Sequence, residues 1–122
     1  MASAQHGNLR QAPTVSDLSG STGLAVVVNS SGQCVLAGAA VIIDGVLVDD
    51  PKNGQAGTYQ VRDVAKVVAG AAITRGANLT TNASAQFIAA TTGNPIVAKA
   101  LDAAGAASQV IRAEIGYRGV SA

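Results

Sequence analysis

Short apolar runs alternate with turn signals through residues 71–115, whose sequence is AAITRGANLTTNASAQFIAATTGNPIVAKALDAAGAASQVIRAEI. Glycine and proline recur throughout, so the long uninterrupted period that a helix needs does not develop there. This spacing is typical of β-hairpins. With the apolar runs that precede it, the region predicts an all-β fold of about eight short strands, a small β-barrel or β-sandwich with at most one short helical turn.

Two apolar runs before this region also predict strands. Residues 24–28, LAVVV, are too short and too rich in β-branched side chains for a helix. The polar run NSSG that follows them leads into residues 33–36, so this pair is predicted to form a hairpin. Residues 39–48 are almost continuously apolar, and Asp44 and Gly45 interrupt them. That dipeptide fits either a two-residue hairpin turn or a bulged strand.

Residues 58–68, TYQVRDVAKVV, alternate between apolar and polar side chains more clearly than any other run, and they predict one half-buried strand. Asp63 and Val64 break the alternation, because the carboxylate falls on the apolar face. This break indicates a bulge, or an Asp63 side chain paired with a basic group. Residues 109–115 predict another half-buried strand, and the alanine-rich residues 102–108 fit one helical turn or a wide loop.

The N-terminal residues differ from the rest of the chain. Residues 1–22 are rich in small polar side chains, contain Pro13 and follow neither the helical nor the strand period. We therefore expect an extended N-terminal arm at 1–22, a β-barrel domain at 23–116 and a short C-terminal tail at 117–122. The isolated apolar side chains of the arm, with its first charge, are candidates for contact with a partner: Leu9, Arg10, Val15 and Leu18. The alternative is a disordered terminus.

Composition narrows the range of partners. Hydrophobic residues make up 48% of the chain and charged residues 12%, with one Phe, two Tyr and no Trp. A core with few aromatic side chains buries little area, so we expect stabilisation by a homo-oligomer or by docking on a larger surface. The net charge of +1 comes from scattered charges, which disfavours nucleic-acid binding. No apolar stretch reaches the roughly 20 residues that cross a bilayer, and the first residues lack the apolar centre of a secretory signal. We therefore expect synthesis in a cytoplasm and no membrane partner.

Few residues of the chain could carry chemistry. His6 is the one histidine and Cys34 the one cysteine, too few for a zinc site, and nothing near His6 would fix it as a catalytic base. Cys34 is interpreted as a small buried hydrophobe, with an intermolecular or reactive role as the alternative. Asp49 and Asp50 precede a proline and are interpreted as a solvated turn rather than a metal site. We therefore expect no enzyme activity, no cofactor and no metal.

The order of these pieces resembles that of phage capsid decoration (cement) proteins, a family of small β-rich components of the virion head. The resemblance runs from Gly23 to Ile115. It is carried by Gly45-Val46-Leu47 and the polar loop with Gly54 or Gly57, the strand Tyr59 to Val68, AGAAITRGANLTTNASAQFIAATTG, Ile96 to Leu101 with DAAGAAS, and the closing strand Val110 to Ile115.

The resemblance implies a structural protein, made in the host cytoplasm, on the outer surface of the virion. It would bind the major capsid protein and cement neighbouring subunits, which stabilises the head. It also implies a symmetric oligomer, for which a homotrimer is favoured because it matches local threefold positions on a shell.

Two other classes of protein remain open. A β-domain that binds carbohydrate or adheres to a host surface would need exposed aromatic side chains, for which Tyr59 and Tyr117 are the candidates. A small β-barrel hydrolase would need fixed acid and base groups, for which Asp49, Asp50 and Asp63 are the candidates.

Overall fold

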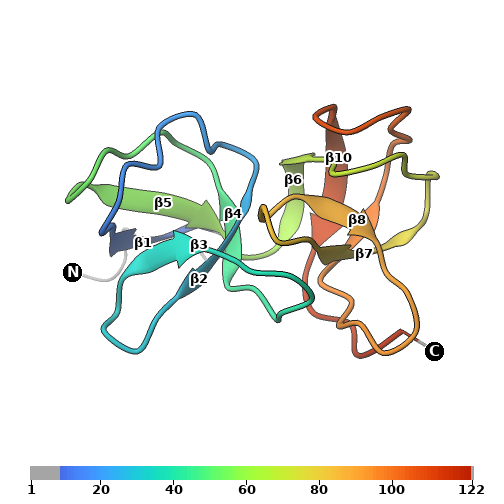
Figure 1. The fold of residues 1–122 in the computed structure, drawn as a ribbon, viewed down its shortest axis with the longest axis horizontal. Helices are drawn as coiled ribbons and strands as arrows, with labels where there is room; N and C mark the ends of the chain where they lie inside the picture. The colour runs from blue at the N-terminus through green and yellow to red at the C-terminus, as the bar shows by residue number, and fades with distance from the viewer. Residues whose placement is uncertain (1–8, 122) are drawn as a thin grey trace.

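The computed structural model of the protein describes residues 9–121, which contain ten β-strands and no helix (Figure 1). The predicted all-β fold is therefore confirmed, with two strands more than the eight or so expected. Residues 102–108, for which a helical turn or a wide loop was expected, form an irregular loop. His6 lies outside the described residues.

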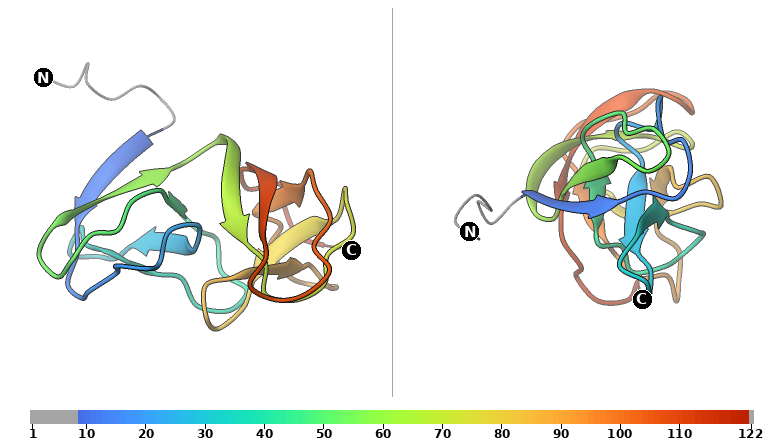
Figure 2. Two further views of the ribbon diagram at one scale, coloured as in Figure 1. Left: turned by 90° about the horizontal axis from the view of Figure 1, so that it is seen from above. Right: turned by 90° about the vertical axis from the view of Figure 1, so that its left-hand side faces the viewer.

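The strands form two antiparallel sheets of five, which we call the first and second lobes. The first lobe has the order β1-β5-β4-β2-β3, with β1 (Leu9–Pro13), β2 (Ala25–Val28), β3 (Cys34–Leu36), β4 (Gly45–Leu47) and β5 (Ala56–Gln60). The second lobe has the order β6-β10-β9-β7-β8, with β6 (Asp63–Val68), β7 (Asn78–Thr81), β8 (Phe87–Ala89), β9 (Ala98–Ala100) and β10 (Val110–Ile115). The two lobes lie side by side along the long axis of the molecule (Figures 1 and 2).

Each sheet curls back on itself without closing. In the first lobe an isolated parallel bridge joins Thr14, directly after β1, to Cys34 of β3. In the second lobe the same kind of bridge joins Ala69, directly after β6, to Phe87 of β8. A single bridge is not the continuous ladder of hydrogen bonds that closes a barrel. The single β-barrel expected for residues 23–116 is therefore replaced by two curled, open sheets.

The run 58–68, predicted as one strand, is divided between the two sheets. β5 ends at Gln60 and β6 begins at Asp63, whose φ of 66° lies in the left-handed region. Aspartate adopts this conformation more readily than most residues. The side-chain amide of Gln60 donates to the carbonyl oxygens of Arg62 at 2.8 Å and Val64 at 2.9 Å, which fastens the corner. The irregularity at Asp63 is thus the point at which the chain changes sheet.

Part of the predicted N-terminal arm belongs to the first sheet. β1 pairs with β5 along its whole length, from Leu9 opposite Gln60 to Pro13 opposite Ala56. Farther along the arm, the backbone N–H of Leu18 donates to the carbonyl of Pro51 at 2.9 Å. β1 is an edge strand, and a proline at its end is compatible with that position because no ladder hydrogen bond is lost.

The two lobes are structural copies of one unit. β1 to β5 correspond in order to β6 to β10, since each strand has the same neighbours in its own sheet. The register agrees as well: Ala25 lies opposite Val46 in the first lobe, and Asn78 lies opposite Lys99 in the second. This duplication was not anticipated from the sequence.

The hydrophobic core is likewise in two parts. Inside the first lobe a small cluster contains Ala12, Leu18, Val26, Cys34, Leu47 and Tyr59. A larger cluster, which includes Phe87 and Leu79, fills the second lobe. Ala25, Ala37 and Val46 of the first lobe belong to this larger cluster, so one outer face of the first lobe is buried against the second.

Candidate functional site

The acidic pair Asp49 and Asp50 has a structural use. The carboxylate oxygens of Asp49 both accept the backbone N–H of Thr58, at 3.1 Å, where the loop returns to β5. Asp50 accepts the hydroxyl of Thr22 at 2.6 Å and the backbone N–H of Gly20 at 3.2 Å. Each carboxylate therefore ties its own loop to a neighbouring segment. Within residues 9–121 no three His, Cys, Asp or Glu side chains gather closely enough to hold a metal ion.

Asp102 occupies the place of Asp49 in the second lobe. Its carboxylate accepts the backbone N–H of Arg112 at 3.2 Å and two guanidinium N–H groups of the same residue at 3.0 and 2.9 Å. These hydrogen bonds from Arg112 lower the pKa of Asp102 to about 2. Both side chains are well exposed, so the pair is a surface clamp on the loop before β10 and contributes little to stability at neutral pH.

The one thiol is inaccessible in the folded chain. Cys34 is fully buried in the core of the first lobe, as predicted, and burial raises the pKa of its thiol. A protonated, enclosed thiol is neither a nucleophile nor a metal ligand. Tyr59 is buried in the same core, and burial raises the pKa of its phenol as well. Neither residue offers reactive chemistry at the surface.

The predicted contact residues are not equally accessible. Leu9 and Val15 are each 44% exposed, and Arg10 is also exposed. Leu18 is only 3% exposed and packs in the core of the first lobe. Leu9 and Arg10 lie at one end of β1, whereas Val15 follows its other end. The four residues therefore do not form one patch, but three of them remain exposed, two on the edge strand and one just after it.

Sequence reasoning missed a further exposed apolar side chain on the second lobe. Val64 is 48% exposed and stands where Leu9 stands in the first lobe: Leu9 lies opposite Gln60 of β5, and Val64 lies opposite Glu114 of β10. An alignment of the turn sequence NSSGQ, which begins at Asn29, with NASAQ, which begins at Asn82, would have indicated the duplication. The correspondence of Leu9 with Val64 follows only from the strand pairing.

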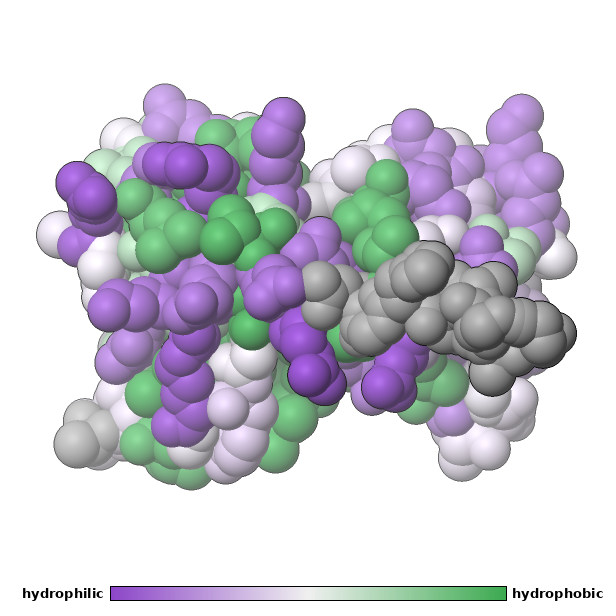
Figure 3. Space-filling view, turned by 180° about the vertical axis from the view of Figure 1, so that it is seen from behind, coloured by the Kyte–Doolittle hydropathy of each residue, from purple (hydrophilic) through white to green (hydrophobic). Residues whose placement is uncertain are grey.

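Apolar side chains are exposed on both lobes. Figure 3 shows them on the face opposite to that of Figure 1, in separate patches surrounded by polar residues. The large apolar side chains that remain exposed are Leu9, Val15, Leu36, Ile42, Val48, Val64, Val110, Tyr117 and Val120.

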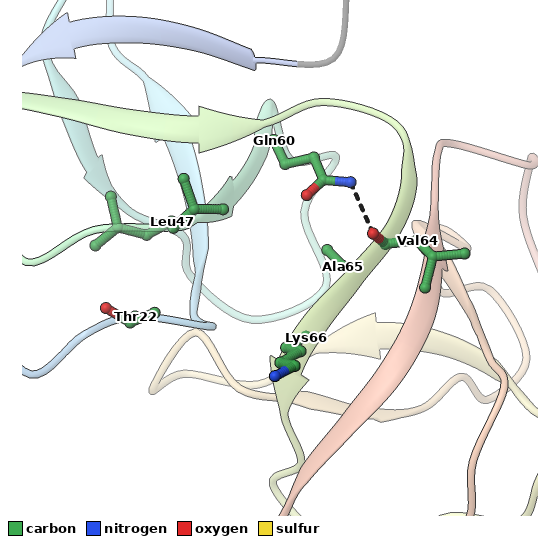
Figure 4. A pocket seen from close by; sticks show the side chains of 7 residues that line it. Thr22, Leu47, Gln60, Val64, Ala65 and Lys66 are labelled. Carbon is green, nitrogen blue, oxygen red and sulfur yellow. Dashed lines mark hydrogen bonds between the residues drawn. The ribbon is translucent and has the colours of Figure 1, made fainter.

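A cleft of about 300 Å³ lies where the lobes meet. Thr22, Leu47, Val48 and Gln60 line it from the first lobe, and Val64, Ala65 and Lys66 from the second (Figure 4). The Gln60 amide points at the Val64 carbonyl and is engaged in holding the corner between the lobes. Lys66 is the one charged group in the lining, so the cleft lacks the convergent polar groups of a small-molecule site.

None of the described segments could cross a bilayer as a helix, since residues 9–121 contain no long apolar helix.

A sequence model of the phage cement protein family matches residues 20–115. No curated protein sequence matches the chain. Among solved structures, the N base of head fiber gp8.5 of bacteriophage phi29 is similar, with a TM-score of 0.71 over 93% of this chain and 98% of that one. The two sequences are 20% identical, so this similarity concerns the fold alone.

Proposed function

The chain belongs to the phage cement protein family, and from this premise we propose that it binds the outer surface of a phage capsid and holds neighbouring major capsid subunits together. A structural virion protein of this kind needs surfaces for its partners and no reactive groups. The observation that carries the proposal is the family match, which includes nine of the ten strands and therefore spans both lobes.

The roles of the polar side chains support a structural protein rather than an enzyme. Asp49, Asp50 and Asp102 are used to fix loops, and Cys34 is enclosed. The sugar-binding alternative loses one of its two aromatic candidates, because Tyr59 is buried and Tyr117 alone is exposed. We therefore propose a non-catalytic role.

The exposed residues of β1 and of the segment directly after it are our candidates for contact with the major capsid protein. Leu9, Arg10 and Val15 present two apolar side chains and one cation along an edge of the first lobe. Val64 adds an equivalent apolar contact on the second lobe. Several such contacts made at once give avidity although each is weak.

We further propose that the chain acts as a homo-oligomer, with a trimer favoured. Alanine supplies nine of the 17 buried residues in the larger core cluster, and the smaller cluster contains only six buried residues, so each lobe buries little area for its length. A closed cyclic oligomer would bury some of the apolar side chains that remain exposed, among which Val110 is 61% exposed. Placed at a local threefold position on a shell, such an oligomer would contact several capsid subunits.

Sedimentation with phage heads that lack the protein tests this proposal. The wild-type chain is expected to co-sediment with saturable occupancy, and the triple variant Leu9→Ser, Arg10→Glu, Val15→Ser is expected to bind at least tenfold more weakly. A matched control, Ile42→Ser, Arg75→Glu, Val120→Ser, makes the same kinds of change at exposed positions away from β1. Failure of the wild-type chain to bind any head preparation would refute capsid binding. Equal loss in both variants would refute the assignment of the contact to β1.

A further inference from the structure

The contact between the lobes joins two different faces of the same structural unit. On the first lobe it uses the outer face of β2 and β4, where Ala25 and Val46 are both fully buried. On the second lobe it uses the β6 edge and the turn before β8: the backbone N–H of Val68 donates to the Gly23 carbonyl at 3.0 Å, and Ala25 N–H donates to the Ala85 carbonyl at 2.9 Å. A head-to-tail contact of this kind generates open chains when like units repeat it.

Within residues 9–121, each lobe therefore has a copy of the face that the other lobe uses, and this copy takes no part in the lobe contact. The second lobe has the counterpart of the β2–β4 face, and the first lobe has the counterpart of the β6 edge. If both of these faces could form the same contact, each molecule would bind the next and the chains would grow without limit. The residues at those faces decide whether this happens.

On the second lobe the counterparts of Ala25 and Val46 are Asn78 and Lys99, which face each other across β7 and β9. Both are exposed, and Glu114 of β10 lies opposite Lys99 on its other side. Burial of the Lys99 ammonium against an apolar partner would remove its hydration without a replacement.

On the first lobe the counterpart of Val68 is Pro13, since Pro13 lies opposite Ala56 and Val68 lies opposite Val110 at the corresponding ends of the two strand pairs. Proline has no backbone N–H. The hydrogen bond that Val68 donates to Gly23 therefore cannot be repeated by the first lobe of another molecule.

We propose that Pro13, Asn78 and Lys99 prevent the contact between the lobes from being repeated between molecules, so that it forms once within each chain. The inference goes beyond capsid binding, and it concerns self-association through these two faces alone. A cyclic oligomer would use other surfaces.

Restoring the residues of the internal contact tests the proposal. One variant, Asn78→Ala with Lys99→Val, gives the face of the second lobe the residue types of Ala25 and Val46. Another, Pro13→Val, gives the β1 edge of the first lobe the backbone N–H that proline lacks. We expect each alone to sediment at the wild-type mass, their mixture to form complexes heavier than either variant alone, and the combined triple variant to form a series of masses that grows with concentration. Far-ultraviolet circular dichroism establishes that each variant is folded.

Lys52→Val serves as the control, because it makes the same change at an exposed position of the loop between β4 and β5, outside the face formed by β7 and β9. Association of this control to the same extent would overturn the proposal in favour of non-specific apolar aggregation. A mixture that sediments as the sum of its two components, with both folded, would overturn it as well. The two single-end variants keep the test valid even where the combined variant fails to fold.

Discussion

Asn29 and Asn82 make the same hydrogen bonds at the same place in the two lobes. The side-chain oxygen of Asn29 accepts the backbone N–H groups of Ser31 and Gln33, each at 3.0 Å. That of Asn82 accepts those of Ser84 at 2.9 Å and Gln86 at 3.0 Å. Each turn joins an inner strand to the edge strand beside it, β2 to β3 in the first lobe and β7 to β8 in the second. The same asparagine-stabilised turn therefore sets the register of this hairpin in each lobe.

Removal of either side chain should destabilise its own lobe. Asn29→Ala and Asn82→Ala each leave two turn N–H groups without their acceptor, and each is expected to lower the free energy of unfolding by about 1–2 kcal/mol. Urea unfolding followed by circular dichroism measures the change. Asn53→Ala, at an exposed loop position, is the control and should cost less than about 0.5 kcal/mol. A loss at Asn29 or Asn82 no larger than that of the control would contradict the shared role.

Gly45 is required by the close approach of β4 to β5. A Cβ added there would lie 2.4 Å from the carbonyl oxygen of Gln60 and 2.8 Å from Cδ2 of Tyr59. Because the nearest atom belongs to the backbone, Gly45→Ala should cost about 1–3 kcal/mol through strand displacement. Gly105→Ala is the matched control, since its added Cβ would meet nothing closer than 3.8 Å. Equal unfolding midpoints for the two variants would show that β4 can shift freely.

Acid should weaken the loop clamp between Asp102 and Arg112. The pKa of Asp102 is lowered in the folded chain from 3.8 to about 2, so its contribution to stability is present above pH 3.8 and is lost as the pH falls toward 2. Asp102→Asn should therefore lower the melting temperature slightly near neutrality and give the wild-type value near pH 2, because the variant lacks the contribution that the wild type loses over that pH range. Melting curves of both proteins between neutral pH and pH 2 provide the measurement. Parallel curves would exclude a contribution from Asp102.

The buried thiol should report on opening of the first lobe. Cys34 is fully buried and the pKa of its thiol is raised, so a disulfide exchange reagent should not modify it in the folded chain and should modify it fully in denaturant. Absorbance of the released thiolate follows the reaction. Rapid complete modification under native conditions would mean that the first lobe opens readily or that Cys34 is exposed.

The sequence predicted those features that are encoded within a few residues. The hairpin across Asn29, the alternation of residues 109–115 and the burial of Cys34 all follow from local patterns and agree with the structure. The division of residues 58–68 between two sheets was missed, because the alternation continues on both sides of the corner and a single left-handed residue, Asp63, redirects the chain. Regular periodicity specifies strand faces and leaves the choice of sheet to tertiary contacts.

The participation of residues 9–13 in a sheet was missed for a different reason. A short polar run ending in Pro13 has no strand signal of its own, and its pairing partner β5 lies far along the chain. The contact residues were inferred from isolated apolar side chains, and that rule does not distinguish Leu18, which fills the core, from Leu9, which remains exposed. Val64 could be recognised as a candidate only once the two lobes were superposed in register.

The most direct test of the cement role is the temperature at which purified phage heads lose their DNA, measured with and without saturating amounts of this chain. A protein that joins neighbouring capsid subunits binds the intact shell better than the ruptured one, so it should raise that temperature. The β1 variant, Leu9→Ser, Arg10→Glu, Val15→Ser, should raise it less at the same total concentration. Full occupancy of the heads by the wild-type chain with no change in the temperature of DNA release would contradict the account.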